Sequence, residues 1–208
     1  MRIQASAVAV VMVIWASSMW AGPGVARDSP PPVQATISAE SVDEIRGLQR
    51  QRDVIARADA AIAELQITLV GRLKAELGKG GPRAAVTVCR DEAQQLTASI
   101  GAKHQLELGR TSHLVRNPSN VPRAWAASYV ASYAGAKVQG AAPAVFEVGD
   151  RVGVLRPIGT MDMCVMCHGP SETVQATIGD VLKASYPADR AVGFAAGDLR
   201  GWFWAEGQ

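Results

Sequence analysis

Apolar residues recur at helical spacing over much of the first half of the chain. From Ser41 to Leu77 there is no proline, and the apolar positions repeat every three or four residues, at Ile45, Leu48, Val54, Ile55, Ala58, Ile62, Leu65, Leu69 and Leu73. Ser41 and Glu44 have the spacing of a capping box, and a glycine-rich run follows at 78–81. The pattern therefore predicts one long helix over 41–77, with an apolar stripe that packs on its own domain or pairs two copies as a homodimer.

A second helix and a mixed second half are expected after it. Pro82 suits the first turn of a helix that runs to Ile100 and closes at Gly101. Further helices are predicted over 124–136, with Trp125, Tyr129 and Tyr133 as core residues, and over 173–184. A polar loop is expected over 110–122, a β-hairpin over 145–155 around Gly149 and Asp150, and a last strand over 201–205. The class expected is α+β, an antiparallel sheet flanked by helices with a long N-terminal helix.

The N-terminus has the pattern of an export signal. Arg2 precedes an uncharged apolar run over 5–21, and small residues at 24–26 offer a cleavage site. We expect a signal peptide over 1–26, a Pro-rich linker over 27–40 and one folded domain over 41–208. A retained membrane anchor is the alternative, because the run is nearly long enough to span a bilayer. A periplasmic or otherwise exported location follows from the first interpretation.

Composition narrows the partners. The chain has 208 residues and a formal net charge of +2, and no basic block is interleaved with aromatic residues. Nucleic acid is therefore not expected as a partner.

Cys164, Cys167 and His168 form a C-x-x-C-H motif. This spacing is typical of c-type haem attachment, in which two thiols bond the porphyrin and the histidine is an axial ligand of the iron. A thioredoxin-like pair would open a helix after a strand of a βαβ unit, whereas Gly169 and Pro170 follow here. A zinc site would need Cys89 as a fourth ligand, and a plain disulfide is the last alternative. One covalently attached haem c is the interpretation we favour.

Four separated segments, taken together and in order, resemble a bacterial family of exported single-haem c-type domains. They are Val88-Cys89, 110–125 with the Arg116-Asn117-Pro118 turn, 156–169 with the C-x-x-C-H motif, and 186–201. Members of the family include stand-alone haem proteins and sensor regions of histidine kinases and chemoreceptors. The resemblance covers roughly residues 41–205 and implies a PAS-like fold.

The resemblance also implies a second ligand for the iron. In one member of the family a cysteine on the helix before the sheet is the sixth ligand of the iron, and the matching residue here is Cys89. A thiolate favours ferric iron and lowers its reduction potential. The alternatives are that Cys89 is a small buried apolar residue, or that His113 makes a bis-histidine site. Met161, Met163 and Met166 are expected to pack on the haem.

Arg110 and Arg116 are candidates for the two propionates of the haem, because guanidinium pairs with carboxylate in a bidentate fashion. A purely structural role in ordering the loop is the alternative for both.

These observations predict a redox or small-gas sensor, with nitric oxide as one candidate gas and a redox partner or a signalling protein as its partner. The alternative is a periplasmic electron-transfer protein without ligand exchange. A six-coordinate iron leaves no open position for peroxidase-like chemistry, so we do not expect an enzyme. The preference for sensing rests on the family resemblance.

Overall fold

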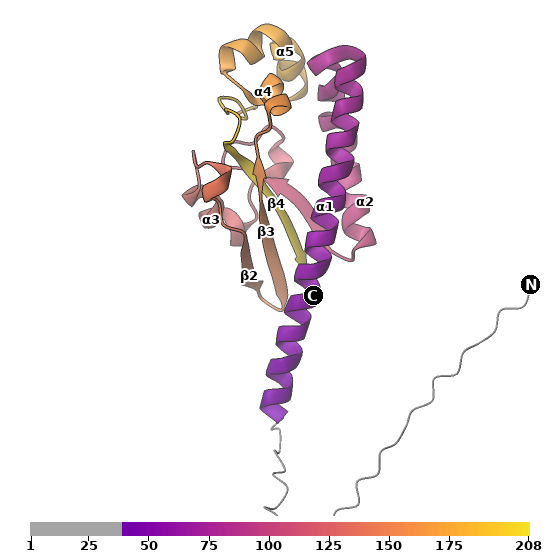
Figure 1. Cartoon of the computed structure of the whole chain (residues 1–208), viewed down its shortest axis with the longest axis vertical. Helices are drawn as coiled ribbons and strands as arrows, with labels where there is room; N and C mark the ends of the chain where they lie inside the picture. Colours follow the sequence, from indigo (N-terminus) through magenta and orange to yellow (C-terminus); the bar gives the residue numbers. More distant parts are fainter. Residues whose placement is uncertain (1–38) are drawn as a thin grey trace, which may run out of the picture. The chain divides into compact units, whose positions relative to one another are not determined.

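A four-stranded antiparallel sheet lies at the centre of the computed structural model, which describes residues 39–208 (Figure 1). Its strands are β1 (Glu107–Thr111), β2 (Ala144–Val148), β3 (Arg151–Gly159) and β4 (Leu199–Gly207), in the order β1-β4-β3-β2. The predicted hairpin is β2–β3, with Val148 opposite Arg151. The α+β class with its antiparallel sheet and long N-terminal helix is thus confirmed.

The long N-terminal helix, α1 (Ala39–Thr87), breaks where the glycines predicted an end. Gly80 and Gly81 leave the helical conformation, and Gly81 has a φ of 65°, which favours glycine. Helix resumes at Pro82 and passes into a five-residue π-helical turn, Val88–Glu92, before α2 (Ala93–Lys103). The second predicted helix is therefore confirmed, although it extends beyond Gly101.

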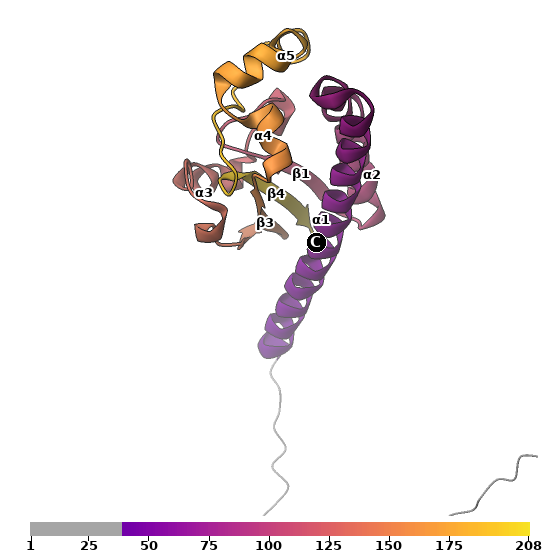
Figure 2. The same ribbon diagram turned by 45° about the horizontal axis from the view of Figure 1, so that its top comes forward.

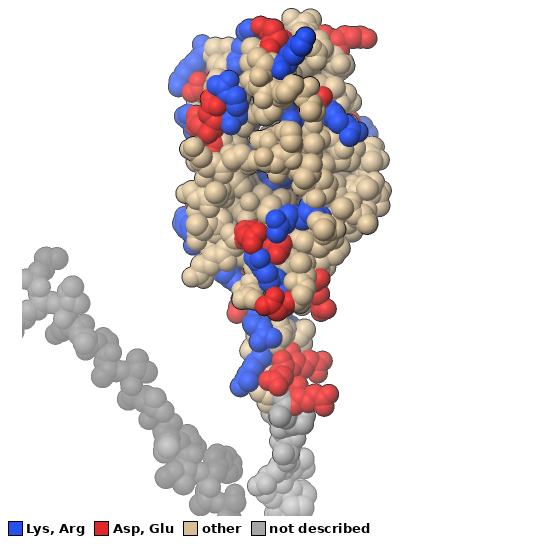
Figure 3. Space-filling model, turned by 180° about the vertical axis from the view of Figure 1, so that it is seen from behind, with Lys and Arg blue, Asp and Glu red and all other residues tan. Residues whose placement is uncertain are grey.

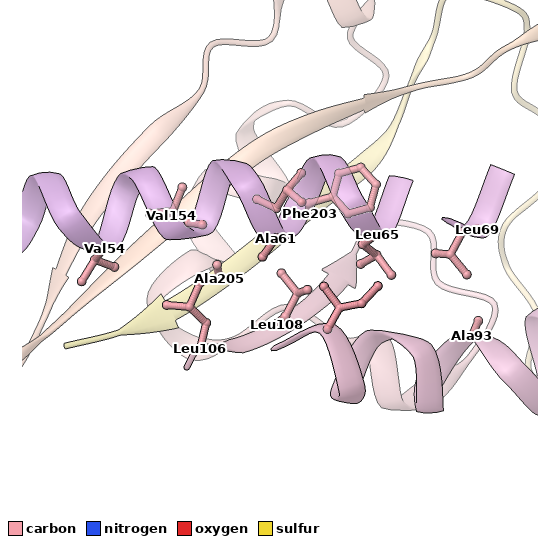
Figure 4. Close-up of a cluster of buried hydrophobic side chains, with 13 residues drawn as sticks. Val54, Ala61, Leu65, Leu69, Ala93, Leu106, Leu108, Val154, Phe203 and Ala205 are labelled. Carbon is pink, nitrogen blue, oxygen red and sulfur yellow. The ribbon is translucent and has the colours of Figure 1, made fainter. Parts of the chain in front are cut away.

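The apolar stripe of α1 packs against one face of the sheet. Figure 4 shows side chains from α1, α2 and three strands meeting in one cluster. Its buried members are Val54, Ala58, Ala61, Ile62, Leu65, Leu69, Ala93, Ile100, Leu106, Leu108, Val154, Phe203 and Ala205. Most of the apolar stripe of α1 therefore packs within its own domain. Ile45 and Leu48, near the start of α1, remain about half exposed, at 48% and 51%.

The opposite face of the sheet is covered by an aromatic cluster. Trp125, Tyr129 and Tyr133 pack with the buried Trp202 of β4, as the sequence predicts for core residues. The helix expected over 124–136 is shorter than predicted: a 3-10 turn, Ala124–Ala126, leads into α3 (Ala127–Ser132).

Two more helices close one end of the sheet. α4 (Asp162–His168) follows β3, and α5 (Ser171–Ser185) follows a turn at Gly169 and Pro170. Figure 2 shows α4 and α5 together at this end, near the end of α1. Val86 packs with Val174, Ile178 and Leu182 of α5 in a third buried cluster.

One prediction is wrong: Arg110 was expected in a polar loop, but it lies on β1, where it pairs with Phe203 of β4. The loop begins only after Thr111, because pairing with β4 keeps residues 107–111 in a strand. Strands β3 and β4 are also longer than predicted.

The surface carries mixed charge. On the face of residues 39–208 seen in Figure 3, basic and acidic side chains intermix and form no broad patch of one sign. None of the helices within 39–208 combines the length and apolar character that a bilayer span needs. The predicted signal peptide, 1–26, and the linker up to residue 38 lie outside the described residues.

Candidate functional site

The C-x-x-C-H motif lies on the short helix α4. Cys164 and Cys167 are three residues apart, so both thiols lie on one helical face, and both line a cavity. α4 ends at His168, and the N–H of the next residue, Gly169, donates to the Val165 carbonyl at 2.8 Å. A methyl group at Gly169 would lie 2.4 Å from that carbonyl oxygen, so this stop requires glycine. The motif therefore ends in a turn, as its Gly-Pro sequence predicts.

The thioredoxin-like alternative finds no support in the fold. The antiparallel sheet contains no βαβ unit of the thioredoxin kind. Cys89, Cys164 and Cys167 are free thiols. Within residues 39–208, no group of three or more His, Cys, Asp or Glu side chains is close enough to hold a metal ion by itself.

Both motif thiols are largely withdrawn from water. Burial raises the pKa of Cys164, and it raises the pKa of Cys167 to about 11. A Cys89 thiolate would raise both pKa values further, which places Cys89 within electrostatic reach of the motif. At neutral pH, Cys164 and Cys167 are therefore protonated thiols.

His168 is oriented for metal binding by its backbone neighbour. Its Nδ1 lies 2.7 Å from the carbonyl oxygen of Ala191, so Nδ1 carries the proton and donates it, and Nε2 is left as the nitrogen that can bind a metal. Burial, followed by the positive charges of Arg200 and Arg116, holds the pKa of His168 well below its usual value. The ring is therefore neutral at pH 7, as a ligand must be.

Arg116 holds the chain segment that orients His168. Its Nε donates to Asp189 Oδ2 at 2.9 Å, and its Nη2 donates to the carbonyls of Cys167 at 2.6 Å and Ala191 at 3.3 Å. Asp189 Oδ1 accepts from the Ala191 N–H at 2.8 Å. Of the two roles considered for Arg116, these contacts favour the structural one. Sequence reasoning missed Asp189 and Ala191, because the network joins segments far apart in the chain.

Cys89 lies on the π-helical turn. The N–H of Ala93 donates to the carbonyl of Val88, five residues earlier, which is the π pattern. Val88 is fully buried, whereas Cys89 is half-buried and lines the cavity. Such single π turns occur frequently at functional sites. The sequence placed Cys89 on a helix, but it contained no signal for the π turn.

One cavity of about 510 Å³ brings these residues together, a volume within the range of roughly 300–1,000 Å³ typical of small-molecule and cofactor sites. Its walls come from α1, the π turn, β1, β3, β4 and α4. Apolar side chains supply much of the lining: Leu69, Val70, Leu73, Leu77, Val86, Val115, Val138, Ile158, Met161, Met163 and Phe203. Tyr186 also faces it, and burial raises the pKa of its phenol to about 12.

Two further arginines, Arg110 and Arg200, line the cavity. The Nε atom of each is buried and has no hydrogen-bond partner within the described part of the chain. Burial lowers the pKa of Arg110, and it lowers that of Arg200 to about 10. Sequence reasoning did not single out Arg200, although it lies in the last of the four family segments, 186–201.

The remaining candidates lie at or beyond the edge of the cavity. Among residues 39–208, neither His113 nor Met166 belongs to its lining. The ring of His113 packs edge-on against Phe194, with centroids 5.9 Å apart, and Met166 is 41% exposed. Of the two residues considered for the second ligand, only Cys89 thus faces the cavity.

The site fits the haem that the sequence predicts. The cavity offers two thiols for attachment, a neutral imidazole beside them, a third thiol on another wall, apolar walls for a porphyrin and buried arginine N–H groups for carboxylates. Fold and site together define a class of protein, an α+β domain with a PAS-like sheet and a C-x-x-C-H cavity.

Comparison with known proteins identifies the family. The model of the Tll0287-like family matches residues 32–205, so the chain belongs to the Tll0287-like family. The crystal structure of the cyanobacterial haem protein Tll0287 is similar in fold, with a TM-score of 0.55, and the match covers 81% of this chain and 95% of that chain at 22% identity. A comparison with curated protein sequences found no match. The predicted resemblance to single-haem c-type domains is thereby confirmed.

Proposed function

We propose that this protein is an exported c-type haem protein that carries one haem in the cavity and serves as a redox or small-gas sensor. The observation that carries the proposal is the convergence on one cavity of Cys164, Cys167 and His168 from α4 with Cys89 from the π turn. A haem bound there would supply one-electron chemistry and affinity for small gases such as nitric oxide.

Attachment is the proposed role of Cys164 and Cys167. Each thiol adds across one vinyl group, with sulfur bonding one carbon and the hydrogen going to the other, so no oxidant is needed. Because both thiols are protonated at neutral pH, each brings the hydrogen that the addition requires. The i, i+3 spacing on α4 presents both sulfurs to the same edge of a ligand.

His168 and Cys89 are the proposed axial ligands. Ala191 fixes the tautomer of His168, and Arg116 fixes Ala191, so the ring is held before any ligand binds. Cys89 approaches from the π turn on another wall of the cavity. The two residues therefore supply an imidazole nitrogen and a sulfur from separate elements.

Sensing is favoured by the backbone that carries Cys89. The π turn joins α1 to α2, and both helices pack on the sheet. If Cys89 gained or lost its ligand contact, the change would act directly on this irregular turn. Its backbone could then switch from the π pattern of hydrogen bonds to that of a regular α-helix. The signal would pass to a separate signalling protein or through a homodimer, for which Ile45 and Leu48 offer exposed apolar surface on α1.

Electron transfer is the second candidate, and a different observation favours it. Met161 lies three residues before the attachment motif and Met166 lies within it, and the two are 42% and 41% exposed. Exposed apolar side chains next to a redox centre would suit brief docking of a redox partner. In that case the contact made by Cys89 would stay the same in both oxidation states.

The substitution Cys89→Ala tests the ligand assignment. We expect the ferric absorption spectrum to change and the reduction potential to rise, by on the order of 100 mV within the span of about 0.8 V that axial ligands cover. His113→Ala is the matched control and should leave the spectrum unchanged. The opposite pattern, a change with His113→Ala and none with Cys89→Ala, would establish the bis-histidine alternative.

Hydrogen exchange distinguishes sensing from electron transfer. We expect the amides of Val88–Glu92 to exchange at a different rate after reduction or after addition of nitric oxide, while those of β2 do not change. Identical exchange in all three states, combined with fast electron exchange with a periplasmic cytochrome, would favour electron transfer.

A further inference from the structure

The charged side chains that line the cavity, among residues 39–208, are three arginines. Arg116 is paired with Asp189, and both side chains are nearly buried, at 8% and 11% exposed. Arg110 and Arg200 have no such carboxylate within the described residues, and the buried Nε of each lacks an acceptor. A buried charge without a paired counter-charge is costly. Asp189 acts on Arg200, and a Cys89 thiolate would act on Arg110, but neither guanidinium forms an ion pair with a described residue. The cavity therefore presents two arginines that could each take a carboxylate.

An irregularity in the sheet puts Arg200 there. Along β4, Trp202 pairs with Pro157 and Gly201 with Ile158, but Gly159 pairs with Leu199, so Arg200 is the extra residue of a β-bulge. Leu199 consequently packs with Trp202 on the aromatic face of the sheet, and Arg200 is turned to the cavity side. Bulges that redirect a side chain in this way are frequent next to functional sites.

The bulge and the guanidinium are both held in place. Ser112 Oγ donates to the backbone carbonyl of Arg200 at 2.8 Å. The guanidinium lies over the ring of Phe194, 4.9 Å from its centroid, and its Nη1 reaches the carbonyl of Leu114 at 3.4 Å. These contacts orient the group, whose Nε is buried and has no acceptor among the described residues.

Arg110 reaches the same cavity from the neighbouring strand. It pairs with Phe203, which belongs to the face of the sheet that packs against α1. Arg110 and Arg200 thus come from adjacent strands and lie on the same side of the sheet. In each, the Nε–H group has no acceptor among the described residues.

We propose that Arg110 and Arg200 form a binding site for two carboxylates of one ligand, with one carboxylate on each guanidinium, and that Arg116 takes no part in it. Resting on the proposed function, this site receives the two propionates of the haem. Two fixed positive charges then match two negative charges in a buried site, in the bidentate geometry that arginine favours. Cys89 is the competing counter-ion, because its thiolate lies close enough to raise the pKa of Arg110.

The test separates recognition of carboxylates from support of the fold. A full-length chain with Cys164→Ala and Cys167→Ala cannot attach haem covalently, so it can be titrated with haem and with haem dimethyl ester, which lacks the carboxylates. In this background, Arg110→Gln and Arg200→Gln should each raise the dissociation constant for haem by about 10- to 100-fold, since charge-assisted hydrogen bonds are lost. The dissociation constant for the ester should not change.

Two matched variants complete the experiment. Arg83→Gln removes an exposed arginine that is paired with Asp180 outside the cavity, and it should alter neither affinity. Arg200→Lys keeps the charge without the planar fork, so it should recover part of the preference for haem over its ester.

Each outcome has one meaning. If the variants lose equal affinity for haem and for its dimethyl ester, the arginines support the fold or balance the charge of Cys89. If they lose no affinity for haem, the arginines do not bind its carboxylates. Either result overturns the proposal. If the unattached chain does not bind haem, a crystal structure of the haem-loaded wild-type protein decides. It should place both guanidinium groups about 2.7–3.0 Å from propionate oxygens, and propionates elsewhere overturn the proposal. A wild-type protein that carries no haem would instead refute the proposed function.

Discussion

Neutralising Asp189 should destabilise this protein more than any surface charge change of the same kind. Asp189→Asn preserves size, and its side-chain oxygen can still accept from the N–H of Ala191, where Asp189 Oδ1 now accepts at 2.8 Å. What is lost is the acceptor for Arg116 Nε, now 2.9 Å away. In the variant, the side-chain NH2 group of the asparagine would face the Nε–H group of Arg116, and both are hydrogen-bond donors.

The magnitude follows from burial. The side chains of Arg116 and Asp189 are only 8% and 11% exposed, so water cannot replace the lost carboxylate. Removing one partner of a buried ion pair costs about 3–5 kcal/mol. Arg116 keeps its bonds to the carbonyls of Cys167 and Ala191, so we expect the lower end, about 3 kcal/mol. For a chain of this size that corresponds to a fall in Tm of roughly 6–12 °C.

Urea denaturation followed by circular dichroism measures the change in the free energy of unfolding. Asp180→Asn is the matched control, because the same neutralisation breaks an exposed pair with Arg83, at 69% and 53% exposure, and should cost much less. The double variant Arg116→Gln with Asp189→Asn should lose less than the sum of the two single variants. A loss for Asp189→Asn no larger than that of the control, or additive losses, would refute the reasoning.

Two further predictions concern the body of the domain. Burial, followed by the hydrogen bond with Tyr133, raises the pKa of Tyr129 to about 12, above its ordinary value of about 10. The stability that the protonated Tyr129 contributes is therefore complete below pH 10 and is lost as the pH rises towards 12. Tyr129→Phe should make the free energy of unfolding decline less steeply over that interval. A decline as steep as that of the wild-type protein would contradict this prediction. Gly109→Ala would put a methyl group 2.3 Å from the indole of Trp204, so thermal unfolding should show a loss of about 1–3 kcal/mol. Gly140→Ala, which meets no described atom within 4 Å, should be nearly neutral, and equal losses for the two variants would count against the argument.

The elements that depend on local patterns were the ones that could be predicted. The periodic stripe of α1, the glycine break at Gly80 and Gly81, the hairpin and the turn after His168 all follow from residues a few positions apart. Boundaries were less accurate where tertiary pairing overrode the local signal. Thus Arg110 became part of β1 because β4 pairs with it, and the helix predicted over 124–136 was shortened to α3.

The sequence by itself determined the chemical groups of the candidate site. The C-x-x-C-H spacing, the single additional cysteine and the family segments are readable along the chain, because a motif of this kind consists of neighbouring residues on one short helix. The same holds for the α+β class, since the side-chain periods of helices and strands are properties of the backbone.

Only the tertiary structure decided how those groups are arranged. Cys89 faces the motif because α1, the π turn and β1 pack into the walls of one cavity, and Arg200 joins them because a bulge in β4 redirects its side chain. Arg116 differs from Arg110 and Arg200 because it forms an ion pair with Asp189. Such distinctions depend on burial and on partners from distant segments, and no local pattern in the sequence encodes them.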